Sequence, residues 1–179
     1  SNHKGAYKAW INMLTRGYCE TFKSNNPTYI GVTVCEEWLN FQNFVSWCKM
    51  QVGYNSRDES GLAYHLDKDI LLRGNKIYSP ETCCFVPRVI NNLLIKKGLS
   101  SGKNHLGVHF VTRKGKFKAS YRKGGVSKHL GYFDDPDEAF LAYKKAKEFH
   151  VKEVAEEWKG AIDVRTYQAL MKWEVISAG

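Results

Sequence analysis

The chain has 179 residues, of which 43% are hydrophobic and 25% are charged, and its formal net charge is +9. This length and composition can supply the core of one ordinary domain or two small ones, which argues against a disordered protein. The five cysteines are odd in number and include no Cys-x-x-Cys pair, as is typical of reduced thiols in a cytoplasmic protein. The chain shows neither an apolar run of roughly 18 residues nor a signal-peptide pattern, so we expect no membrane partner.

The first half of the chain reads as alternating helices and short extended segments. Apolar spacing predicts a helix from Lys4 that ends at Gly17, and the polar residues that follow predict a loop through Pro27. The elements expected next are a strand at 30–35, a helix at 38–52 ending at Gly53, an extended segment at 63–72 with a tight turn at 73–75, a strand at 83–85, and a helix after Pro87 that ends at Gly98.

The small polar residues at 99–104 resemble a linker. We therefore predict an N-terminal domain at 1–98 and a C-terminal domain at 99–179. The second domain is expected to hold three strands at 107–112, 116–122 and 126–132, because Lys114-Gly115 and Gly124-Gly125 suit tight hairpin turns. A helix follows the acidic segment at 134–138, and a last helical pattern covers 161–178, which gives an α+β fold.

Positive charge is concentrated in the second domain. Between Gly98 and Phe133 there are eight Lys and Arg residues and no Asp or Glu. Alternation along the middle strand puts Lys116, Lys118 and Arg122 on one face and apolar residues on the other. A one-sign basic face of this kind attracts polyanions and is typical of nucleic-acid binding.

The same segment carries a family pattern. It reads Gly107-Val-His-Phe, then Gly115-Lys-Phe-Lys-Ala-Ser-Tyr-Arg122, then Lys128-His-Leu-Gly-Tyr-Phe-Asp134, then Glu138-Ala-x-x-Ala-Tyr143-x-x-Ala146. This order resembles the AP2 DNA-binding domain over about 50 residues. The resemblance implies a three-stranded antiparallel sheet packed on one helix, with its outer face in the major groove of duplex DNA.

The resemblance and the alternation together give a set of expected DNA contacts. Arg113 and Arg122 are the best candidates for reading bases, because a guanidinium group can pair bidentately with guanine. Lys114, Lys116, Lys123 and Lys128 are expected to hold phosphates. The other outward positions are His109, Val111, Lys118, Ser120, Ser127 and His129, and His109 and His129 can equally be ordinary surface histidines.

A second pattern lies in the first domain. It comprises Tyr64-His-Leu-Asp-Lys-Asp-Ile-Leu71, then Gly74-Asn-Lys-Ile-Tyr-Ser-Pro-Glu-Thr-Cys-Cys-Phe-Val-Pro87, then Arg88-Val-Ile-Asn-Asn-Leu93. The order of strand, loop, strand and helix resembles the ββα-metal module of phage HNH-type homing endonucleases. Some members of that family join this module to AP2 domains, and a phage-encoded protein would act in the bacterial cytoplasm.

This second resemblance implies hydrolysis of DNA phosphodiester bonds with Mg²⁺ or Mn²⁺. Lys68 stands where the family has its catalytic histidine, and Thr82 stands where it has an asparagine. His65 is the nearest imidazole. Residues 65, 67 and 69 alternate along the expected extended segment, so His65, Asp67 and Asp69 share one strand face. The candidate catalytic set is therefore His65, Asp67, Lys68, Asp69, Asn91 and Asn92, with Asp67 and Asp69 as metal ligands.

Other readings stay open at this point. The Lys68 and Thr82 departures are compatible with an inactive module in a DNA-binding regulator or accessory protein. His65 can be a hydrogen-bonded strand residue, and Asp67 and Asp69 can be turn caps or ion-pair partners. RNA binding is disfavoured because the basic face lacks the paired aromatic residues of RNA-recognition motifs. Cys83 and Cys84 lack the second ligand pair that a zinc site needs.

Overall fold

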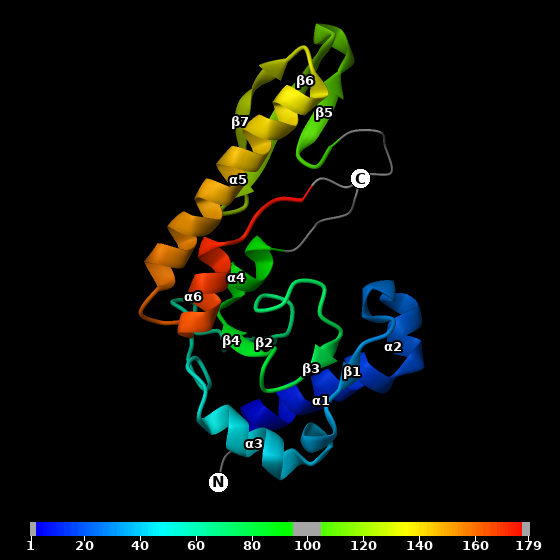
Figure 1. The fold of residues 1–179 in the computed structure, drawn as a ribbon, viewed down its shortest axis with the longest axis vertical. Coiled ribbons are helices and arrows are strands. Elements are labelled where there is room, and N and C mark those ends of the chain that lie inside the picture. The colour runs from blue at the N-terminus through cyan, green and yellow to red at the C-terminus, as the bar shows by residue number, and fades with distance from the viewer. Residues whose placement is uncertain (1–2, 95–104, 177–179) are drawn as a thin grey trace. The chain divides into compact units, whose positions relative to one another are not determined.

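The computed structural model describes residues 3–94 and 105–176 (Figure 1). The chain forms two compact units: unit 1 comprises Ser1–Leu94 and Trp158–Ala169, and unit 2 comprises Ile95–Glu157 and Leu170–Gly179. Unit 1 thus includes residues 158–169, whereas the predicted boundary after residue 98 assigns them to the second domain. The predicted linker at 99–104 and the predicted helix end at Gly98 lie outside the described residues.

Unit 1 combines helices with two small strand pairs. Its elements are α1 (Lys4–Tyr18), α2 (Glu20–Asn25), β1 (Thr33–Val34), α3 (Phe41–Lys49), β2 (His65–Asp67), β3 (Ile77–Tyr78), β4 (Cys84–Val86), α4 (Arg88–Leu93) and α6 (Val164–Met171), of which the last two residues belong to unit 2. β1 pairs in parallel with β3, and β2 pairs antiparallel with β4. The run β2, β4, α4 has the predicted order of strand, loop, strand and helix.

Two elements of unit 1 differ from expectation. The extended segment predicted at 63–72 is a strand only at His65–Asp67, because the Asp67 carboxylate accepts hydrogen bonds from the backbone N–H groups of Asp69 and Ile70 and turns the chain. The predicted loop before Pro27 contains α2. Its end is fixed by the Asn26 side-chain amide, which donates to the Phe22 carbonyl.

The core of unit 1 is aromatic. Trp38, Phe44 and Trp47 pack against one another, and Trp47 also meets Phe85 of β4. All four side chains are buried and form the core of unit 1. This core fixes β4 and so the strand partner of His65.

Unit 2 is a three-stranded antiparallel sheet with a helix on one face (Figure 1). The strands β5 (Val108–Val111), β6 (Lys116–Lys123) and β7 (Val126–Phe133) lie where the turn signals predict them. The helix α5 (Pro136–Trp158) begins after Asp135, whose carboxylate accepts the N–H of Asp137. Ala139, Phe140 and Tyr143 of α5 pack with Val108 and Ala119 of the sheet.

The close approach of α5 to the sheet depends on a glycine. Gly107 has a φ of +77°, and a Cβ at this position would overlap the ring of Tyr143.

The helix predicted at 161–178 is shorter than expected, and α6 ends at Met171. The chain beyond it packs Trp173 and Val175 into the core of unit 2. None of the helices that the structure describes has both the length and the apolar character needed to cross a membrane.

Candidate nucleic-acid interface and candidate active site

The face of the unit 2 sheet opposite α5 carries polar and basic side chains. Cross-strand pairing places His109 opposite Lys118, Ser120 opposite His129, and Arg122 opposite Ser127. Directly opposed residues project from the same side of a sheet. We call these six residues the basic face. The pairing agrees with the outward positions expected for these residues.

Charge neutralisation separates the predicted cations into two groups. Lys116 pairs with Asp134 at 3.0 Å, and Lys123 pairs with Glu153 of α5 at 2.8 Å. Arg113, Lys118, Arg122 and Lys128 form no ion pair with any residue that the structure describes. The charge of the unpaired cations is not offset by a carboxylate, so it can attract an external anion.

Two lysines predicted to hold phosphates lie on the helix side of the sheet. Lys128 is opposite Tyr121, and Tyr121 packs toward the core beneath α5. Lys123 follows the same alternation and reaches Glu153. Among the predicted phosphate contacts, Lys123 and Lys128 therefore lie outside the basic face as the register defines it.

Tyr132 is a member of this surface that alternation along β7 does not predict. A register shift at Ala119/Ser120 leaves Leu130 as an extra residue, and Lys118 then lies opposite Tyr132. Gly131 permits the irregularity with a φ of +149°. The Tyr132 ring lies 4.7 Å from that of His129, and the Lys114 ammonium lies 3.7 Å from the centre of the Tyr132 ring.

His109 has a defined polarity. Its Nδ1 lies 2.7 Å from the Val108 carbonyl oxygen, which can only accept, so Nδ1 carries a proton. In the neutral ring Nε2 is then an acceptor, suited to an exocyclic amine of adenine or cytosine.

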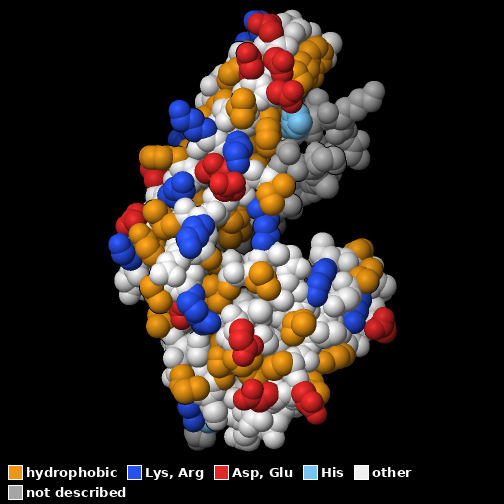
Figure 2. All heavy atoms as spheres, viewed as in Figure 1, with side chains coloured by type: hydrophobic (Ala, Val, Ile, Leu, Met, Phe, Trp, Pro, Cys, Tyr) orange, Lys and Arg blue, Asp and Glu red, His pale blue; other side chains and the backbone are white. Residues whose placement is uncertain are grey.

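The helix side of unit 2 carries charges of both signs: Figure 2 shows Lys, Arg, Asp and Glu side chains mixed along α5.

In unit 1, the structure brings His65 and Asn91 together. His65 lies at the start of β2 opposite Val86, and the Asn91 side-chain amide from α4 lies 3.4 Å from His65 Nδ1. The atom nearest Nδ1 is the amide nitrogen Nδ2, which donates to Nδ1; a proton acceptor at Nε2 requires the amide to be turned over, so that its oxygen accepts from Nδ1–H. Asn92, the alternative predicted partner, is exposed and does not line the same cleft.

Asp67 is held by its own turn. Its Oδ1 accepts from the N–H of Asp69 at 2.7 Å and of Ile70 at 2.8 Å. Burial raises the pKa of the Asp67 carboxyl, and these two hydrogen bonds oppose the rise. The arrangement matches the turn-cap alternative given above.

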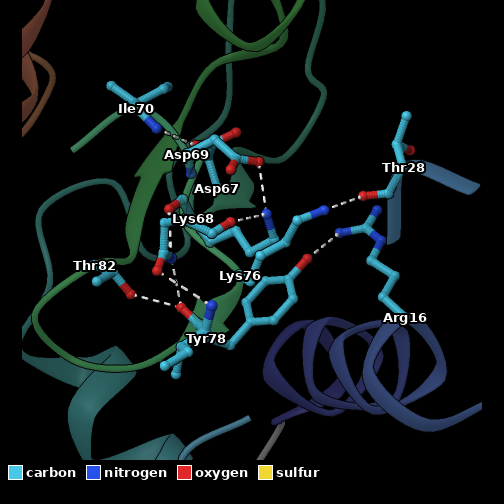
Figure 3. Close-up of polar contacts among 11 residues, drawn as sticks. Arg16, Thr28, Asp67, Lys68, Asp69, Ile70, Lys76, Tyr78 and Thr82 are labelled. Atoms are coloured by element: carbon cyan, nitrogen blue, oxygen red, sulfur yellow. Dashed lines mark hydrogen bonds and ion pairs between the residues drawn. The ribbon is translucent and has the colours of Figure 1, made fainter. Parts of the chain in front are cut away.

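Lys68 points into a polar network (Figure 3). Its side chain is 7% exposed, and its Nζ donates to Asp69 Oδ2 at 2.7 Å and to the Asn75 carbonyl at 2.8 Å. Asn75 in turn donates to the carbonyls of Lys68 and Ile77. Lys68 thus closes the loop between β2 and β3, and its ammonium already pairs with Asp69.

Asp67 and Asp69 are each engaged by other groups, Asp67 by two backbone N–H groups and Asp69 by Lys68. Asp69 lies beyond the end of β2, so the predicted alternation of His65, Asp67 and Asp69 on one strand face does not extend to it. Within residues 3–94 and 105–176, no group of three His, Cys, Asp or Glu side chains is placed to hold a metal ion. The ammonium of Lys68 also disfavours a divalent cation at Asp69.

The remaining polar groups of this region are structural. Thr82 Oγ1 donates to the Ile77 carbonyl at 2.8 Å. Cys83 and Cys84 are buried, and burial raises the pKa of Cys84 to about 12 and also raises the pKa of Cys83. Zinc needs thiolates, so this environment does not favour a zinc site.

A cleft of about 490 Å³ in unit 1 collects the candidate groups. Its lining includes His65, Asp67, Lys68, Asp69 and Asn91, together with cations from two helices: Lys8 and Arg16 of α1, and Arg88 of α4. With Lys68, the cleft is lined by four cations and by only two carboxylates, those of Asp67 and Asp69. Lys8 and Arg16 are not part of the motif from which the site was predicted. Their spacing, two turns apart on one helix face, is the pattern that could have indicated a shared basic surface.

Comparison with known proteins adds no relative: no protein-family model, no curated protein and no solved structure matches this chain.

Proposed function

We propose that the protein binds double-stranded DNA through the basic face of unit 2. The observation that carries this proposal is the two-sided sheet, with one face buried against α5 and the other bearing Lys118, Arg122 and two histidines. A two-stranded ribbon or small sheet fits the major groove, where guanidinium and imidazole groups can reach base edges. The resemblance to AP2 domains supports the same assignment.

A salt-titrated binding assay on the full chain tests this proposal. Fluorescence anisotropy with a labelled duplex is expected to show binding that weakens steeply with salt, because phosphate contacts release counterions. Single-stranded RNA is the competitor. Stronger binding to RNA than to duplex DNA would contradict the assignment.

For unit 1 we propose an HNH-like endonuclease in which His65 is the general base. His65 would remove a proton from water, which attacks the phosphorus atom as the bond to the leaving oxygen breaks. With its amide turned so that the oxygen accepts from Nδ1–H, Asn91 would hold the imidazole in the orientation and tautomer that a base at Nε2 requires. The bound divalent cation that the family resemblance implies would neutralise charge on the leaving oxygen, but Asp67 and Asp69, which are held by backbone N–H groups and by Lys68, do not fit it in this arrangement.

The second candidate is a DNA-binding protein whose HNH-like module does not cut. The Lys68 network supports it, since the residue at the family's histidine position holds Asp69 and a loop carbonyl in place of substrate. Incubating the protein with long duplex DNA and Mg²⁺ or Mn²⁺, and in parallel with chelator, decides between the two. Discrete cutting that requires metal supports the endonuclease; tight binding without cutting supports the inactive module.

A further inference from the structure

The cleft of unit 1 has a basic wall that the chemistry described above does not use. Lys8, Asn12 and Arg16 follow one another at intervals of four residues along α1, so they share one helix face. The buried residues of α1 are Ala6, Met13 and Gly17, which face the core. Arg88 of α4 lines the same cleft, as do His65 and Asn91.

The carboxylates in the cleft leave most of this charge unopposed. Asp69 is paired with Lys68, and Asp67 is engaged by two backbone N–H groups. Lys8 and Arg88 are exposed, and within the described part of the chain neither of them forms an ion pair. An unpaired cation in a concave polar site focuses positive potential there.

Arg16 is held in place by uncharged groups. Its Nη1 donates to the Tyr78 hydroxyl at 3.3 Å (Figure 3). Its guanidinium carbon lies 5.5 Å from the centre of the Tyr29 ring. Burial raises the pKa of Tyr78 to about 12, so this partner stays neutral at ordinary pH. The guanidinium is thus oriented before any ligand arrives, which lowers the entropic cost of binding an anion.

We propose that this cleft is a second nucleic-acid site, in which Lys8 and Arg88 hold a backbone phosphate beside His65, with Arg16 and Asn12 along the same wall. The inference rests on the proposed function, because it takes the ligand to be a nucleic acid. It does not depend on whether unit 1 cuts, since these cations would hold a phosphate without hydrolysing it. It assigns unit 1 a binding role independent of the basic face of unit 2.

The test compares Lys8→Gln and Arg88→Gln with Lys49→Gln in the full chain. Lys49 is an exposed lysine at the end of α3 that does not line the cleft, so the control removes one charge of the same unit. Each cleft variant is expected to lower the salt slope of duplex binding by about 0.9, the value for one lost phosphate contact, and to weaken binding about fivefold at moderate salt. The control is expected to change both quantities much less.

A second readout locates the contact. The imidazole NMR signals of His65, assigned by their loss in His65→Gln, are expected to shift when a 12-base-pair duplex is added to the wild-type protein. The shift should shrink in the Lys8→Gln/Arg88→Gln double variant. Both substituted side chains are exposed, so thermal unfolding should be unchanged and a folding defect would be recognised.

The outcomes separate the two proposals. If the wild-type protein does not bind duplex DNA, the proposed function fails. If it binds, but the cleft variants behave like Lys49→Gln and the His65 signals do not move, the cleft assignment is overturned and the basic face of unit 2 is unaffected.

Discussion

The side-chain amide nitrogen of Asn91 lies 3.4 Å from Nδ1 of His65, and this contact joins α4 to β2. An imidazole that is oriented through one nitrogen can exchange a proton through the other. The pair is therefore the part of the candidate active site that the structure assembles, whereas Asp67, Lys68 and Asp69 are engaged in the loop that follows.

The first prediction concerns this pair. If unit 1 hydrolyses DNA, His65→Ala should lower the cleavage rate by about 10²–10⁴-fold, the usual contribution of a general base, and leave duplex binding nearly intact. Asn91→Ala should cause a smaller loss, because the base remains but is less well oriented. Asn92→Ala is the matched control from the adjacent position of α4. Cleavage that is unaffected by His65→Ala would show that another group is the base.

Asp67 gives a prediction about stability. Asp67→Ala removes the acceptor of two backbone hydrogen bonds and should lower the free energy of unfolding by about 1–2 kcal/mol. Asp67→Asn keeps an acceptor oxygen and should be tolerated better. Urea unfolding at neutral pH measures both. This loss of stability means that loss of cutting in Asp67→Ala alone would not identify a metal ligand.

The raised pKa of Asp67 also predicts a pH dependence. The folded protein binds this proton more tightly than the unfolded chain does, so the contribution of the neutral carboxyl to stability is present below the unfolded pKa. It is lost as the pH rises through the folded pKa. In Asp67→Asn, the decrease in the free energy of unfolding that Asp67 causes with rising pH should be absent. An identical profile in both proteins would mean that Asp67 does not titrate abnormally.

The basic face of unit 2 can be tested against the opposite side of the same strand. Lys118→Ala with Arg122→Ala should weaken duplex binding and flatten its salt dependence, and a base contact by Arg122 would contribute about 1–3 kcal/mol of discrimination. Lys123→Ala is the control, because Lys123 pairs with Glu153 on the helix side. Equal effects of the face variant and the control would argue for unspecific charge attraction.

Tyr132 should support the same surface. The Lys114 ammonium lies over its ring, so Tyr132→Ala should release Lys114 and weaken duplex binding by about 0.5–1 kcal/mol. Tyr132→Phe keeps the ring and should bind almost as the wild type does. Anisotropy titrations of the three proteins measure the difference, and a loss in Tyr132→Phe equal to that in Tyr132→Ala would instead implicate the hydroxyl group.

Local patterns predicted much of this architecture. The three strands of unit 2 follow from alternation and glycine turns, and β4 with α4 follows from the apolar run ending at Pro87. The outward position of Tyr132 did not follow, because a bulge changes the alternation and depends on the neighbouring strand. Lys68 was expected to be available for catalysis. Its burial depends on Asn75 and Tyr78, which only the folded loop brings to it.

The path of the chain through the two units has a consequence for how the protein is made. Thr166 and Ile162 are buried, and Thr166 lies close to Cys84 of β4, so part of the interior of unit 1 leaves the ribosome after the whole sheet of unit 2. A fragment that stops at residue 98 lacks these side chains and would expose apolar surface around β4. Nascent unit 1 must therefore stay incomplete, and open to chaperones, until the segment at 158–169 has been synthesised.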